Sequence, residues 1–168
     1  LLASLGAALA ASPPGYDAVL RAHVKGRAVD YTALKASGTL GPVLSSLGRM
    51  PEPTDNAGRM AFWINAYNAL TLGLVVEAWP ITSLQDLDGG RVWDTRTYRV
   101  AGQDVTLNQI EHQILRPLGD PRVHAALNCA SRGCPALQDT AFVANTLDAQ
   151  LGAASRAWAD SNAVRIDR

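Results

Sequence analysis

The longest uncharged stretch of the chain, residues 60–76, constrains the fold more than any other feature. It is slightly shorter than the roughly 20 apolar residues that a membrane-spanning helix needs, and Asn65, Asn68 and Thr71 interrupt it. A buried helix explains it better than a membrane span does, because a folded domain can supply partners for the amides. We therefore expect a long core helix over residues 57–79 and no membrane span.

Shorter elements are predicted around this helix. Residues 91–105 contain β-formers on both sides of an Ala-Gly-Gln turn, which indicates a hairpin. Thr106 and Gln109 have the spacing of a capping box, which predicts a helix after the hairpin. Residues 123–128 alternate apolar and polar side chains, which predicts a strand, and Asp139 can cap a last helix. Further expected elements are short helices at Val19, Leu20 and Val24, after Asp30, and at Leu40, Val43, Leu44 and Leu47, with Asp55 or Asn56 capping the long helix, Pro80 ending it, and a final strand at Val164 and Ile166.

The composition fits a single folded domain. The chain has 168 residues, 48% of them apolar and 18% charged, with 15 basic and 15 acidic side chains. This balance argues against intrinsic disorder and against nucleic acid as a partner. We expect an α+β fold dominated by helices, in which the hairpin and the strand at 123–128 form a small antiparallel sheet.

The two ends of the chain are interpreted separately from this domain. Residues 1–15 begin with an almost wholly apolar run, which is either the remnant of an export signal or an ordinary N-terminal helix. The first alternative favours a periplasmic or secreted protein, while a cytoplasmic location stays open. Residues 16–168 are assigned to the single domain.

The chemically most informative segment is His124-Ala-Ala-Leu-Asn128-Cys129-Ala-Ser131-Arg-Gly133-Cys134-Pro135. A thiol here follows the predicted strand and lies in a loop with polar neighbours. Thiolate is the reactive form of cysteine, and an unperturbed thiol with a pKa near ~8.5 needs an imidazole, a cation or helix-terminal N–H groups to ionise at neutral pH. Asn128, Ser131 and the backbone around Gly133 are candidate oxyanion donors, although a buried cysteine that only fills space is also a common arrangement.

Two histidines are candidate bases for Cys129. His112 follows Glu111 on the helix that begins after Thr106, and we prefer it as the base. His124 would lie roughly 16 Å from Cys129 along a straight strand, so it is a supporting residue or a second candidate base unless the loop folds back. Glu111 either orients the imidazole or forms an ordinary ion pair with Arg116 or Arg122.

Asn65 and Asn68 share one face of the otherwise apolar core helix. Buried amides must find hydrogen-bond partners, so these two either hold backbone segments in register or contribute to the site. In the functional alternative, Asn65 orients the imidazole or binds a substrate carbonyl, as a third group does in catalytic triads. A metal site built from His112, His124, Cys129 and Cys134 matches no familiar zinc spacing, so no metal and no cofactor are expected.

Several of these segments resemble one family, called domain of unknown function 547, which is found in bacteria and as a C-terminal domain in plants. The resemblance implies a domain over about residues 16–168 that continues past Arg168 in relatives. It also implies that the Cys129 position keeps its thiol while the Cys134 position is often Ser, which argues against an essential disulfide between them. The matching motifs are Val29-Asp30-Tyr31, Phe62-Trp63-Ile64-Asn65-Ala66-Tyr67-Asn68-Ala69, Ile110-Glu111-His112 with Ile114-Leu115-Arg116, and Asp120-Pro121-Arg122 followed by His124-Ala125-Ala126-Leu127-Asn128-Cys129-Ala130-Ser131 and Cys134-Pro135.

The combination of Cys129, His112, Glu111 and Asn65 is similar to the equipment of papain-like and transglutaminase-like thiol enzymes. Those enzymes place Cys before His in the chain, so the likeness concerns geometry only. It predicts a hydrolase or acyl transferase acting on an amide or thioester of a small-molecule, peptide or glutathione-like substrate. The alternative is a non-catalytic module that binds a small ligand or peptide in the same cleft.

Overall fold

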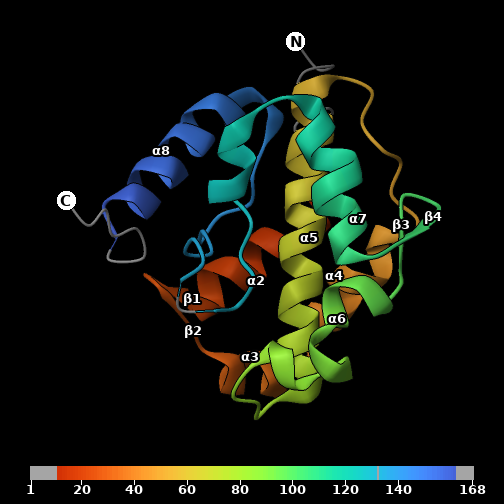
Figure 1. Ribbon diagram of the computed structural model, residues 1–168, viewed down its shortest axis with the longest axis vertical. Coiled ribbons are helices and arrows are strands. Elements are labelled where there is room, and N and C mark those ends of the chain that lie inside the picture. The colour runs from red at the N-terminus through yellow and green to blue at the C-terminus, as the bar shows by residue number, and fades with distance from the viewer. Residues whose placement is uncertain (1–10, 132, 162–168) are drawn as a thin grey trace.

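A single long helix, α5 (Asn56–Ala78), forms the centre of the molecule (Figure 1). The computed structural model describes residues 11–131 and 133–161. Every residue from 60 to 72 is buried, because other elements pack against all sides of the helix. The Asp55 carboxylate caps its first turn by accepting from the Gly58 N–H at 2.7 Å, as the sequence predicted. No helix in the described ranges is long and apolar enough to cross a membrane.

The other elements surround α5, and Figure 1 shows α8 and the β3–β4 hairpin on opposite sides of it. The predicted class, an α+β single domain dominated by helices, is confirmed. In chain order the elements are α2 (Tyr16–His23), β1 (Val24–Lys25), β2 (Ala28–Val29), α3 (Tyr31–Ser37), α4 (Leu40–Leu47), α5, the 3-10 turns η1 (Leu84–Asp86) and η2 (Asp88–Gly90), α6 (Val92–Thr95), β3 (Tyr98–Val100), β4 (Gln103–Val105), α7 (Leu107–Gln109), the π-helical turn η3 (Ile110–Leu115), the 3-10 turns η4 (Arg116–Leu118), η5 (Pro121–Ala125) and η6 (Ala144–Thr146), and α8 (Leu147–Ala159).

Two groups of apolar side chains pack on α5. The larger group joins α5 to η3, η5, α8 and the β3–β4 hairpin, and includes the fully buried Trp63. The smaller group joins α2, α3 and α4 to the face of α5 that carries Ala69 and Leu72. Each face of α5 therefore has its own apolar partners. This explains why the helix is hydrophobic on all sides, as is typical of a central helix.

The predicted starts of two further helices are confirmed. Asp30 caps α3 by accepting from the Ala33 N–H at 2.9 Å. Thr106 and Gln109 form the predicted capping box at the start of α7, with both reciprocal hydrogen bonds present. From there α7, η3 and η4 continue as one helical segment, which packs along α5.

The predicted strand at residues 123–128 is wrong. Pro121–Ala125 is instead the 3-10 turn η5, which the Asp120 carboxylate caps by accepting from the Arg122 N–H at 2.9 Å. Proline at the first helical position and an aspartate before it favour a helical start, and two alanines add little strand preference. Among the described residues, the two small antiparallel sheets are therefore the hairpins β1–β2 and β3–β4, in which Val24 pairs with Val29 and Tyr98 with Val105.

Two more expectations about elements need correction. The hairpin within 91–105 is confirmed for β3 and β4, but its first part is the short helix α6. The last helix does not begin at Asp139, because the backbone before it is held by distant side chains. The Phe142 N–H donates to Asn65 Oδ1 and the Ala141 N–H to Asp17 Oδ1, so this segment stays extended until η6. The expected strand at Val164 and Ile166 and the apolar start at residues 1–10 lie outside the described residues.

Candidate functional site

The site begins with Asn68 of α5, which is buried and holds the segment between His124 and Cys129. Its Nδ2 donates to the Ala126 carbonyl at 2.9 Å, and its Oδ1 accepts from the Asn128 N–H at 2.9 Å. One amide thus satisfies two backbone groups where the chain leaves η5. Because α5 is rigid, this pair of bonds fixes where the cysteine loop starts.

Asn128 holds the loop itself in shape. Its Nδ2 donates to the Pro135 carbonyl at 2.8 Å, and its Oδ1 accepts from the Ala130 N–H at 3.0 Å. Ala130 lies in the left-handed region with a φ of 57°, which reverses the chain direction. Both polar atoms of the Asn128 side chain contact the backbone of this loop, so Asn128 positions the loop.

Cys129 and Cys134 form a disulfide across this loop. The expectation of a free thiol at Cys129 therefore does not hold for the form described here, and a nucleophile at this position requires reduction. The Ser131 hydroxyl lies 3.5 Å from the sulfur of Cys129 and 3.2 Å from that of Cys134. The Cys129 backbone N–H has no hydrogen-bond partner among the described residues and is a candidate oxyanion donor.

Glu111 pairs with His124 and not with His112. The Glu111 Oε1 atom lies 3.3 Å from His124 Nδ1 and 3.4 Å from Arg116 Nη2, and the Arg116 Nη2 atom lies 3.4 Å from His124 Nε2. The Glu111 side chain is only 17% exposed, so its carboxylate needs these partners. A carboxylate on Nδ1 favours the tautomer that leaves Nε2 as the proton acceptor.

A cavity of about 160 Å³ brings these groups together. Glu111, His124 and Cys129 line it from η3, η5 and the loop. Trp158 of α8 forms another wall, where its ring meets the His124 ring edge to face with centroids 6.5 Å apart. Its indole N–H donates to the Gly133 carbonyl at 3.3 Å, which ties the loop to α8. The remaining lining residues are Tyr67, Leu127, Gly133, Cys134 and Pro135.

Tyr67 adds a neutral hydroxyl to this cavity. Burial raises the pKa of Tyr67 above its usual value, the negative charge of Glu111 raises it further, and a hydrogen bond with Trp93 lowers it slightly. The phenol therefore stays protonated over the physiological pH range. The cavity therefore includes a neutral phenol that is close enough to Glu111 to feel its charge.

The structure separates the predicted site residues into two groups. Glu111, His124 and Cys129 share the cavity, with Ser131 on the sulfur atoms. His112 is exposed and does not line the cavity, so the preferred base of the sequence prediction lies outside it and the second candidate lies within it. Asn65 is also elsewhere, since its amide bonds the Ala11 carbonyl at 2.8 Å and the Phe142 backbone at 2.8 and 2.9 Å.

The candidate base changes from His112 to His124 because the predicted strand at residues 123–128 is wrong. A straight strand would carry His124 far from Cys129, whereas the compact turn η5 and the bonds of Asn68 shorten that path. Trp158, in the last helix, was not among the predicted site residues. No spacing in the sequence indicates that this ring faces His124, because α8 reaches η5 through tertiary packing.

The four residues weighed for a metal site do not form one. Within the residues that the structure describes, no group of three or more His, Cys, Asp and Glu side chains is placed to hold a metal ion. His112 is exposed and outside the cavity, and both thiols are joined to each other.

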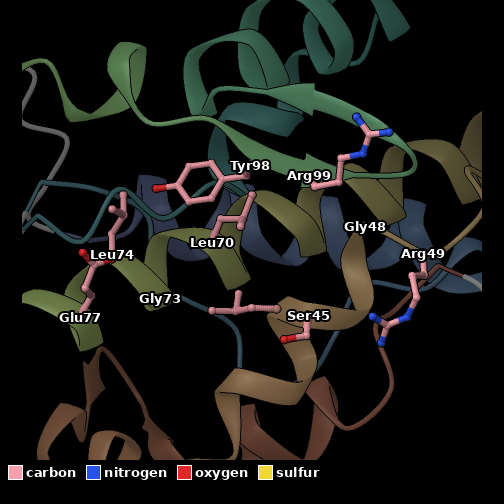
Figure 2. A pocket seen from close by; sticks show the side chains of 10 residues that line it. Ser45, Gly48, Arg49, Leu70, Gly73, Leu74, Glu77, Tyr98 and Arg99 are labelled. Atoms are coloured by element: carbon pink, nitrogen blue, oxygen red, sulfur yellow. The ribbon is translucent and has the colours of Figure 1, made fainter.

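A second cavity, of about 490 Å³, lies between α4, α5 and β3 (Figure 2). Leu44, Leu70 and Leu74 line it together with polar residues, and Figure 2 shows Glu77 and Arg49 at its opposite ends. No cysteine or histidine lines it. It offers space without an evident base or nucleophile pair, so the smaller cavity remains the candidate site.

The family described as "Protein of unknown function, DUF547" matches residues 51–158, which is well over half of the chain. The chain belongs to the DUF547 family. The DUF547 match contains every residue that lines the candidate cavity, from Tyr67 to Trp158. It begins later than residue 16, the start expected from the sequence, and leaves Val29-Asp30-Tyr31 outside. No curated protein and no solved structure matches the chain.

Proposed function

We propose that this DUF547 domain is a thiol-dependent hydrolase or acyl transferase that acts on an amide or thioester. Cys129 is the nucleophile, His124 is the base and Glu111 orients the imidazole. The observation that carries the proposal is the Glu111–His124 contact of 3.3 Å in the same small cavity as Cys129. A nucleophile, a base and a group that orients the base are the three parts of a catalytic triad.

The reaction starts from the reduced protein. A dithiol reductant first opens the Cys129–Cys134 disulfide, becomes a disulfide itself and leaves two thiols on the protein. His124 then takes the Cys129 proton while the sulfur attacks the substrate carbonyl, and the Cys129 N–H and the Ser131 hydroxyl donate to the oxyanion. The imidazolium protonates the leaving amine or thiol as the bond breaks. Water or an acceptor nucleophile then attacks the acyl-enzyme thioester and regenerates the Cys129 thiol.

The alternative is a non-catalytic module that binds a small ligand or peptide in this cavity. The disulfide favours it, because a protein that acts in the oxidised form has no free thiol at this position. The two functions differ in one measurable property. An enzyme needs Cys129 to be a reactive thiolate near neutral pH, and a binding module does not.

The test uses Cys134→Ser, which cannot form the disulfide, and compares it with the double variant Cys134→Ser/His124→Ala. Alkylation by iodoacetamide is followed from pH 5 to 10, and hydrolysis of an aryl thioester is measured in parallel. The proposal predicts half-maximal alkylation well below pH 8, against about 8.5 for an ordinary thiol, and a shift to higher pH without His124. An ordinary profile in both proteins, with no thioester turnover above the Cys129→Ser background, would overturn it.

A further inference from the structure

His124 lies between two cavities, and the second one is not part of the site described above. A cavity of about 430 Å³ is lined by Arg116, Gly119, Asp120, Pro121, Val123 and His124. It shares the imidazole with the cavity that holds Cys129. A ligand in the larger cavity would therefore reach the candidate base without entering through the walls formed by Trp158 and Pro135.

Arg116, the cation that lines this cavity of about 430 Å³, has unused hydrogen-bond donors. A guanidinium carries five N–H donors, and Arg116 uses only its Nη2 atom, in two long contacts of 3.4 Å with Glu111 and His124. Its Nε and Nη1 atoms have no partner among the described residues. The side chain is 52% exposed, so these donors are accessible to a ligand.

The acidic residue of the same cavity is already paired. Asp120 accepts from the Arg122 backbone N–H and from the Arg122 guanidinium, whose Nη2 lies 2.7 Å from Oδ2. Hydrogen bonds from that guanidinium lower the pKa of Asp120, so the pair stays ionised and internally neutral. Repulsion of an incoming anion by Asp120 is therefore offset by Arg122, and Arg116 remains the cation with unused donors.

We infer that this cavity is a subsite for a carboxylate group of the substrate, held by Arg116 beside His124. The inference rests on the proposed function and names its substrate class: an amide or thioester whose acyl group also carries a carboxylate. Arginine binds planar carboxylates through paired N–H donors, and each such pair combines Nη2 with either Nε or Nη1. A carboxylate would therefore take one unused atom of Arg116 and share Nη2, whose present contacts are long, at 3.4 Å. A carboxylate there also competes with His124 Nε2 for the guanidinium, which frees Nε2 to accept the Cys129 proton.

The first arm of the test measures binding without catalysis. Propionate, inorganic phosphate and the neutral analogue propionamide are titrated into the Cys134→Ser protein while the ring resonances of His124 are followed by NMR. We expect propionate to shift these resonances and propionamide to leave them unchanged. The response should be lost in Arg116→Gln and kept in Arg99→Gln. The second of these variants removes an exposed arginine at the cavity of about 490 Å³ between α4, α5 and β3. Equal responses to the acid and the amide, a response that Arg116→Gln retains, or a clear preference for phosphate would each overturn the assignment.

The second arm measures specificity during turnover. Aryl thioesters of a succinyl group and of the isosteric neutral succinamoyl group are compared as substrates. A charge-assisted bond predicts a preference of about tenfold to a hundredfold in kcat/KM for the succinyl thioester, which Arg116→Gln abolishes. Equal turnover of both thioesters overturns the subsite but leaves the enzyme proposal intact. Propionate binding that depends on Arg116 supports the subsite even when neither thioester is hydrolysed. Failure of the subsite and failure of the proposed function can therefore be distinguished.

Discussion

The Nδ1 atom of His124 lies 3.3 Å from the Oε1 atom of Glu111. This contact joins two elements whose proximity no sequence pattern predicted. Glu111 belongs to the π-helical turn η3 and His124 to the 3-10 turn η5. The carboxylate is mostly buried, while the ring is 54% exposed at the cavity. A shielded carboxylate can fix the orientation and tautomer of an imidazole that still meets solvent and substrate.

The two histidines of this region provide a matched pair of variants. In the Cys134→Ser background, His124→Ala should lower thioester turnover by about 10²- to 10⁴-fold, because it removes the general base. His112→Ala should leave turnover within about twofold, since that side chain is exposed outside the cavity. Steady-state kinetics on the two variants show which histidine is the base. A larger loss of turnover in His112→Ala would support His112, the base first predicted from the sequence.

Variants of the two buried asparagines of α5 can distinguish a role in positioning the cysteine loop from a role in stabilising the fold. Asn68→Ala and Asn65→Ala should each lower the free energy of unfolding, by about 1–3 kcal/mol for each buried backbone group left without a partner. Only Asn68 holds the Ala126 carbonyl and the Asn128 N–H next to the cysteine loop. In the Cys134→Ser background, alkylation of Cys129 at pH 7 should therefore slow in Asn68→Ala and stay unchanged in Asn65→Ala, in protein shown by circular dichroism to be folded. Equal rates in both variants would contradict a positioning role for Asn68.

The disulfide predicts a dependence on reductant. Wild-type protein purified without reductant should be inert to iodoacetamide at Cys129 and should gain reactivity when dithiothreitol is added, because the disulfide removes the thiolate. Cys134→Ser should react at the same rate with and without dithiothreitol. Peptide mass mapping of the alkylated protein gives the answer, and reactivity of the untreated wild type equal to that of Cys134→Ser would show that the disulfide does not form in solution.

Asp120 should make the stability of the domain depend on pH. Hydrogen bonds from Arg122 lower the pKa of Asp120 in the folded protein below its ordinary value of 3.8. A carboxyl group with a lowered folded pKa stabilises the fold above its unfolded pKa, and that contribution is lost as the pH falls through the folded pKa. Asp120→Asn should therefore be destabilising near pH 7, and its difference from the wild type should shrink as the pH falls below about 4.

Asp148 is the control for this measurement. It also contacts Arg122, at 2.8 Å, but its side chain is 92% exposed, and such a pair contributes only about 0–1 kcal/mol. Urea unfolding at pH 7, 5 and 3 should show little effect of Asp148→Asn at any of these values. A constant difference between Asp120→Asn and the wild type across the range would refute the assigned linkage.

The amino-acid sequence by itself determined the elements whose signals are local. The uncharged stretch predicted α5, and Asp30, Asp55 and the Thr106–Gln109 pair predicted three helix starts, because a cap and an apolar period act within a few residues. The same reasoning singled out Cys129, Glu111 and the two histidines as the groups able to do chemistry. It failed where a distant side chain overrides the local pattern, as Asn65 does at Phe142.

The tertiary structure alone decided which of those groups meet. Asn68 and the turn η5 bring His124 rather than His112 to the cavity, and α8 supplies Trp158 as its wall. Each of these contacts joins residues far apart in the chain, and their formation depends on how α5, η5 and α8 pack together. No spacing rule along the sequence contains that information, because the free energy that selects the arrangement comes from burying apolar surface and satisfying buried amides in three dimensions.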